Sequence, residues 1–189
     1  RRTTAALGEP MAVDLESDPL VFFPLVYWAV NATQEQPSEA ARGRINDYLR
    51  NGGMILLDTA EAGEGELRRL TEGLAIPPLA AVDERHVLTR SFYLLRDMPG
   101  RYAGAPVWVE RGDETINDGV SSVIVGGNGW AGAWAIDGEG RALLPVVPGG
   151  ERQRELAVRF GVNLVMYALT GNYKADQVHV PAIMERLGQ

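Results

Sequence analysis

Two continuous apolar runs, at 22–28 and 54–57, lie on either side of an amphipathic stretch near the start of this chain. Such runs are typical of strands that are buried on both faces of a parallel sheet. The apolar residues between them recur at helical spacing, at Ala41, Ile45, Tyr48 and Leu49. Ser38 is suited to N-cap this helix, and Asn51-Gly52-Gly53 to end it. Residues 20–59 therefore predict a strand, a helix and a second strand.

The alternation of strand and helix continues once more and then weakens. Residues 63–75 predict a second amphipathic helix, closed by Pro77-Pro78. Residues 82–104 mix charged, aromatic and glycine residues, so we expect an irregular segment on the surface. This alternation predicts an α/β fold of the doubly wound type.

Short apolar runs in the second half predict added antiparallel strands, at 106–110, 121–125 and 131–136. Asp137-Gly138-Glu139-Gly140 predicts a hairpin turn into one more strand at 142–146. The sheet is therefore expected to be mostly parallel at first and antiparallel later.

The helical spacing is most regular from Glu151 to Leu169, and Gly171 is expected to end that helix. The tail at 172–189 still carries apolar residues. We expect this tail to dock on a partner or a neighbouring domain.

Composition narrows the classes of partner. The chain has 189 residues, 46% of them hydrophobic, which predicts one domain over 1–189. A formal net charge of −7 opposes binding to nucleic acid or to an anionic membrane surface. The chain has no cysteine, which excludes disulfides, thiolate metal sites and a cysteine nucleophile. The longest apolar run, at 20–30, falls short of the roughly 18 residues that suggest a membrane span, so we expect a soluble segment that does not insert.

A glycine-rich motif, Gly127-Asn128-Gly129-Trp130-Ala131-Gly132, matches the letters of a dinucleotide-binding turn. That site requires a helix directly after the turn, whereas the pattern here predicts a strand, so we expect neither nucleotide nor any other cofactor. The glycines would then form a tight turn near a sheet end. Trp130 and Trp134 would fill the core or, alternatively, form a stacking platform for a sugar or a peptide.

Asp58 lies where open α/β sheets bind ligands, beyond the carboxyl end of a strand, and Glu61 follows in the same loop. An aspartate here could equally cap a helix or hold a loop through an Asx turn. His86 follows a run of charged residues that favours a solvated loop over a metal site, and no metal is predicted. Arg90, Tyr93 and Arg96 could bind an anion together with a helix N-terminus, or form ordinary surface pairs.

Several stretches together resemble a known bacterial family. They are 23–28, 48–49 with 52–59, 86–88 with 91–93, and 163–164 with 167–171. In this order and spacing they are similar to domain-of-unknown-function family 4159, over nearly the whole chain.

The resemblance implies a fold similar to class I glutamine amidotransferases, a flavodoxin-like three-layer sandwich, and no known reaction. It also implies a membrane-anchored parent protein with an aerotolerance-regulator-type N-terminal region. A chain that begins with Arg1 rather than Met agrees with a segment of such a parent. The family usually carries a further strand and helix upstream, so the first element of the sheet is expected to be missing. The family's amidotransferase relatives use a cysteine that this chain lacks.

We therefore expect a non-catalytic module that binds a protein or a small ligand in a membrane-anchored protein of the cell envelope or of stress physiology. The candidate ligand-binding residues are Asp58, Glu61, His86, Arg90, Tyr93, Trp130 and Trp134. One alternative is a hydrolase that uses Asp58, Glu61 and His86, with or without a divalent metal. Another is an assembly domain that oligomerises through an apolar surface.

Overall fold

Five strands form one mixed sheet in the computed structural model, which describes residues 10–111 and 120–187 of the backbone. The strands are β1 (Leu25–Asn31), β2 (Met54–Glu61), β3 (Leu79–Ala81), β4 (Val107–Glu110) and β5 (Val123–Gly126). The helices are α1 (Glu39–Arg50), α2 (Glu64–Thr71), α3 (Trp130–Trp134) and α4 (Glu151–Leu187), with 3-10 turns η1 (Leu20–Phe22) and η2 (Val87–Thr89). Side chains are described as far as Thr170.

The order across the sheet is β1-β2-β5-β4-β3. β1, β2 and β5 are parallel, β4 runs antiparallel to β5, and β3 runs antiparallel to β4. The predicted α/β fold, with parallel strands first and antiparallel strands later, is confirmed.

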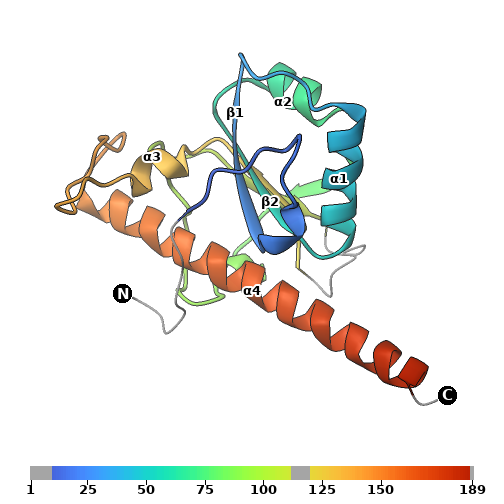
Figure 1. The fold of residues 1–189 in the computed structure, drawn as a ribbon. Coiled ribbons are helices and arrows are strands. Elements are labelled where there is room, and N and C mark those ends of the chain that lie inside the picture. The colour runs from blue at the N-terminus through green and yellow to red at the C-terminus, as the bar shows by residue number, and fades with distance from the viewer. Residues whose placement is uncertain (1–9, 112–119, 188–189) are drawn as a thin grey trace.

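Helices cover both faces of this sheet. On β2, Ile55 and Leu57 face the core formed with α1 and α2, while Met54 and Leu56 face the core formed with α4. This alternation is why β2 reads as a continuous apolar run. The result is a three-layer sandwich in which α4 runs along one face and projects past the other elements at its C-terminal end (Figure 1).

The first half of the chain follows its predicted pattern closely. The Ser38 side chain accepts from the Ala41 N–H at 3.1 Å and caps α1, whose four predicted apolar residues are all buried. The strand β1, however, begins only at Leu25, because Pro24 lacks an N–H for the ladder. The side chain of Phe22 is 77% exposed in the preceding turn η1.

Two strands predicted in the second half are wrong. Residues 130–134 form α3, and near the predicted strand at 142–146 there are isolated bridges, between Ile136 and Ala142 and between Tyr102 and Val147. Gly129, at φ +64°, reverses the chain in the left-handed region directly after β5, and the small residues that follow allow a tight helical turn. Alternating apolar letters alone do not distinguish this helix from a strand.

Two further predictions about α4 and the segment before β4 need correction. α4 does not end at Gly171 but continues to Leu187, because a glycine ends a helix only when it adopts a left-handed conformation and otherwise costs about 1 kcal/mol. Residues 82–104 are irregular apart from η2, as predicted, yet Leu88 and Leu95 are fully buried against α4. The prediction that the tail at 172–189 docks on a partner or a neighbouring domain depends on side chains that lie outside the described residues.

Candidate functional site

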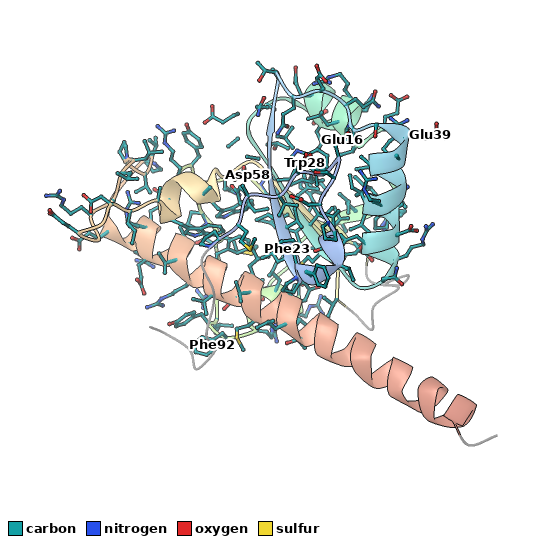
Figure 2. The ribbon with its side chains drawn as sticks, in the orientation of Figure 1. Glu16, Phe23, Trp28, Glu39, Asp58 and Phe92 are labelled. Atoms are coloured by element: carbon teal, nitrogen blue, oxygen red, sulfur yellow. The ribbon has the colours of Figure 1, made fainter. Side chains whose placement is uncertain are left out.

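The carboxylate of Asp58 lies at the carboxyl end of β2 and is 3% exposed (Figure 2). Oδ1 accepts from the N–H groups of Ala60 and Gly129, each at 3.1 Å. Oδ2 accepts from the Trp130 N–H at 2.8 Å and from the Tyr27 hydroxyl. A carboxylate with four donors is fully hydrogen-bonded, so Asp58 ties β1, β2 and the start of α3 together.

Tyr27 is the partner that sequence reasoning did not single out. Its hydroxyl donates to Asp58 and accepts from the Ala131 N–H at 3.1 Å. Burial, reinforced by the neighbouring carboxylate, raises the pKa of Tyr27 well above its ordinary value, so the phenol stays protonated. The available signal was a phenol inside an apolar strand, because a buried tyrosine hydroxyl requires a partner.

The glycine-rich turn does open a helix, contrary to the prediction of a strand there. The N–H groups of Gly129 and Trp130, which an anion at this turn would use, donate to Asp58 instead. The side chain of Asp58 therefore takes the place that a phosphate would occupy at such a helix start.

The two candidate tryptophans are held inside the fold. Trp130 is completely buried, stacks on Phe160 at 4.8 Å and donates from Nε1 to the Met98 carbonyl at 3.1 Å. Trp134 is half-buried and donates from Nε1 to the Ala157 carbonyl of α4 at 2.7 Å. Trp130 cannot serve as a stacking platform, whereas one side of Trp134 reaches the surface.

His86, Arg90 and Tyr93 lie at the other end of the sheet from Asp58. The His86 ring packs edge-on against Tyr167 at 5.7 Å, and the Tyr167 hydroxyl accepts from Ser121 N–H just before the amino end of β5. Figure 2 shows Asp58 and Phe92, the neighbour of Tyr93, on opposite sides of α4. The structure therefore brings neither His86 nor Tyr93 to Asp58.

Local contacts account for the positions of these residues. His86 Nδ1 accepts from the Leu88 N–H at 3.2 Å and caps η2, and burial lowers the pKa of its imidazole although Asp83 opposes the shift. Arg90 donates to the Glu84 carbonyl at 2.5 Å. The Tyr93 ring lies 5.1 Å from the guanidinium of Arg159.

Glu61 is exposed at the end of β2, and its nearest cation is Arg101, with 4.0 Å between Oε1 and Nη1. At this distance and exposure the pair contributes little to stability. Of the seven candidates, four belong to the carboxyl end of the sheet: Asp58, Glu61, Trp130 and Trp134, whose ring packs edge-on against Tyr27 at 5.8 Å. Of these four, only Glu61 presents its polar atoms to solvent.

Two buried amides on α4 were also missed. The Asn163 amide donates to the Leu88 and Tyr93 carbonyls at 2.9 and 2.8 Å and accepts from the Tyr93 N–H at 2.7 Å. Gln153 donates to the carbonyls of Gly100, Arg101 and Val147 at 2.9–3.2 Å. Both residues fall on the inward face of the predicted helix, and that polar placement was the signal available in the sequence.

An apolar groove of about 350 Å³ lies along the outer side of α4. Its walls are Trp134, Ile136, Val158, Gly161, Val162, Val165 and Met166. Trp134 rests directly on Gly161, where an added Cβ would lie 3.1 Å from the indole ring. Ile136 at its rim is 58% exposed. α4 thus carries apolar residues on two faces, one against the sheet and one open, and the apolar residues beyond a single face were visible in the sequence.

Within 10–111 and 120–170, whose side chains the structure describes, no three His, Asp or Glu side chains gather closely enough to hold a metal ion. In the same ranges, no helix has the length and hydropathy that crossing a bilayer requires.

The fold and these contacts define a flavodoxin-like α/β sandwich with an internally hydrogen-bonded crevice and an open apolar helix face. The chain belongs to the family described as Domain of unknown function (DUF4159), which matches residues 1–169. No curated protein matches the chain.

Proposed function

We propose that this chain is a non-catalytic protein-binding module whose docking surface is the groove on the outer side of α4. The observation that carries the proposal is the groove itself, in which apolar side chains of Trp134, Val162 and Val165 remain open to water. Contiguous apolar surface of this kind marks interaction sites, since covering it is favourable by about 25 cal/mol per Å².

The crevice at the carboxyl end of the sheet supports a binding or catalytic role less well. The oxygens of Asp58 are all used by donors of the fold itself, and Tyr27 is held as a neutral donor to the same carboxylate. A general base must instead reach the proton of a substrate. A hydrolase that pairs Asp58 with His86 would need these residues to come together from opposite ends of the sheet.

The shape of the groove suits an apolar helix. Val158, Val162 and Val165 follow one another at helical spacing along a ridge, and Trp134 with Ile136 forms the opposite wall. A partner helix can place its apolar face between such walls. Met166 adds a flexible side chain that adapts to the surface it meets.

Family membership supports a second part of the proposal: the parent is a membrane-anchored bacterial protein that serves the cell envelope or the stress response. We expect the full-length protein to sediment with the membrane fraction and to be released by detergent but not by high salt. Recovery in the soluble fraction would contradict this part and leave the groove proposal standing.

A photo-crosslinking amino acid at position 162 tests the groove directly. We expect one discrete protein adduct in cells, and its loss when Val165→Lys places a charge in the groove. The matched control is the same probe at Gly43 on α1, where an added Cβ would meet no neighbouring atom within 4 Å. Equal, diffuse labelling from both positions would contradict the proposal.

A further inference from the structure

We infer that Tyr27 is a positioning residue of the groove: its ring holds Trp134, which forms one wall of the groove, and its hydroxyl is fixed by the carboxylate of Asp58. The inference rests on the proposed function, because it names the residue that shapes the docking surface of that function. The features that carry it are the contacts of α3, the place of Tyr27 between Asp58 and Trp134, and the apolar surface that Trp134 leaves open.

α3 depends on the rest of the fold for its conformation. It contains five residues, fewer than the roughly 12–15 that an isolated helix needs in water. Acceptors from the sheet hold its first turn: Asp58 accepts from the Trp130 N–H at 2.8 Å, and the Tyr27 hydroxyl accepts from the Ala131 N–H at 3.1 Å. The orientation of Trp134, at the end of α3, is therefore set by contacts with other elements.

The ring of Trp134 is held by α4 and by β1. Its Nε1 donates to the Ala157 carbonyl at 2.7 Å, and the indole rests on Gly161, where an added Cβ would lie 3.1 Å from the ring. From β1, the ring of Tyr27 meets the indole edge-on, with 5.8 Å between the ring centroids and 64° between the planes. Aromatic pairs favour this geometry. Tyr27 thus supports the indole from the side of the sheet.

The position of Trp134 decides how much of the groove is open. The side chains of Val162 and Val165 line the groove beside the indole, and burial of such apolar surface is favourable. An indole released from Tyr27 is therefore expected to turn toward these valines and cover them. A ring that is held in place keeps the groove open and spares a partner the entropic cost of ordering this side chain.

Both ends of the Tyr27 side chain are engaged. The hydroxyl donates to Asp58 and accepts from the Ala131 N–H, and the raised pKa of the phenol keeps it protonated. The ring edge meets Trp134. A change at the carboxyl end of the sheet is therefore expected to reach the groove wall through this one side chain.

A second tyrosine provides a matched control. Tyr48 on α1 is buried, and its hydroxyl donates to the Phe23 carbonyl at 2.8 Å and accepts from the Met54 N–H at 3.1 Å. Tyr48 belongs to the core formed with α1 and α2, whereas Tyr27 and Trp134 pack against the core formed with α4. Tyr48→Phe therefore removes a hydrogen-bonded hydroxyl, as Tyr27→Phe does, on the other face of the sheet.

The experiment reads the position of Trp134 and the state of the groove separately. The protein is labelled with fluorotryptophan, and the fluorine NMR signal of Trp134 is assigned through Trp134→Phe. The groove is probed with the neutral dye Nile red, whose binding should be lost in Val165→Lys. We expect Tyr27→Phe and, more strongly, Tyr27→Leu to shift the Trp134 signal and to weaken Nile red binding by about two- to tenfold, the range that an edge-on aromatic pair is worth. Tyr48→Phe should change neither the signal nor the binding.

The outcomes separate this inference from the proposed function. A Tyr27→Leu protein with the Trp134 signal and the Nile red affinity of the parent would overturn the inference and keep the proposed function. Equal changes in Tyr48→Phe would also overturn it, because the effect would then come from a general loosening of the fold. A parent that neither binds Nile red nor gives a discrete adduct at position 162 would overturn the proposed function and the inference with it.

Discussion

The carboxyl end of the sheet has its polar groups fully hydrogen-bonded, whereas the outer side of α4 leaves apolar side chains exposed. At the carboxyl end, polar groups from β1, β2 and the turn before α3 converge on Asp58 and satisfy one another. On α4, apolar side chains remain open around Gly161. Convergent polar residues at the usual ligand position thus stabilise the fold here, and the capacity to bind lies in an apolar surface.

The glycine-rich turn at 127–132 suggests two opposite functions, depending on what its N–H groups meet. A strand, a turn of glycines and a helix start make an anion site when the N–H groups are vacant. Here the carboxylate of Asp58 comes from the neighbouring strand β2 and occupies them. Whether such a turn binds a ligand is decided by the residue that faces it from another element.

The largest expected effect is that of Asp58→Ala. It leaves four buried or half-buried donors without their acceptor, so we expect a loss of about 4 kcal/mol in the free energy of unfolding. Urea denaturation measures the loss, and Asp47→Ala, at a side chain that is 65% exposed, should stay within about 0.5 kcal/mol of the parent. An Asp58→Ala protein of unchanged or higher stability would contradict the structural role of Asp58 and favour a binding site in this crevice.

A smaller loss is expected when the space beneath α3 is filled. In Gly126→Ala the new Cβ would lie 2.4 Å from the Trp130 ring, which must shift within a close-packed core, at a cost of about 2 kcal/mol. The matched control is Gly65→Ala on α2, where nothing lies within 4 Å and helix propensity favours alanine. Thermal unfolding should give a lower Tm for Gly126→Ala and a higher Tm for Gly65→Ala than for the parent. Equal stability of the two variants would show that Trp130 is not fixed against the turn.

A weaker effect is the pH dependence of stability caused by His86, which lies at the other end of the sheet from the crevice. The pKa of His86 is lowered by burial, so near pH 6 the unfolded chain binds more protons than the folded one. Stability should therefore fall as pH drops below about 6.5, until the native pKa is passed. His86→Asn keeps a cap acceptor for η2 and should flatten this dependence. A dependence that persists in His86→Asn would place the titrating group elsewhere.

The smallest change in stability is expected on α4. Val162→Lys replaces an incompletely buried residue with a better helix former, so the free energy of unfolding of the isolated monomer should change by less than about 0.5 kcal/mol. Crosslinking through the groove should nevertheless be lost. Urea denaturation of the variant and the parent checks this expectation. A loss of several kcal/mol would mean that Val162 belongs to the core, and would remove the contrast between the two regions.

Sequence patterns predicted those elements whose signals are local. The stripe of Ala41 and Ile45 with the cap at Ser38 fixed α1, and continuous apolar runs marked β2 and most of β1. The helix at 130–134 escaped prediction because Trp130-Ala131-Gly132-Ala133-Trp134 fits both periods over so short a length. The sequence predicted an end of α4 at Gly171, which is too early, because the sequence alone does not determine whether that glycine adopts the left-handed conformation that ends a helix.

The candidate site shows the same division. The sequence alone determined that Asp58 directly follows a continuous apolar run, that the chain has no cysteine nucleophile and that its formal net charge is −7. Only the tertiary structure decided that Tyr27 and the turn at Gly129 saturate Asp58, that His86 lies at the other end of the sheet and that the second apolar face of α4 stays open. Periodicity and capping depend on residues a few positions apart, whereas hydrogen-bond saturation and surface exposure depend on residues that are distant along the chain and meet only when the sheet assembles.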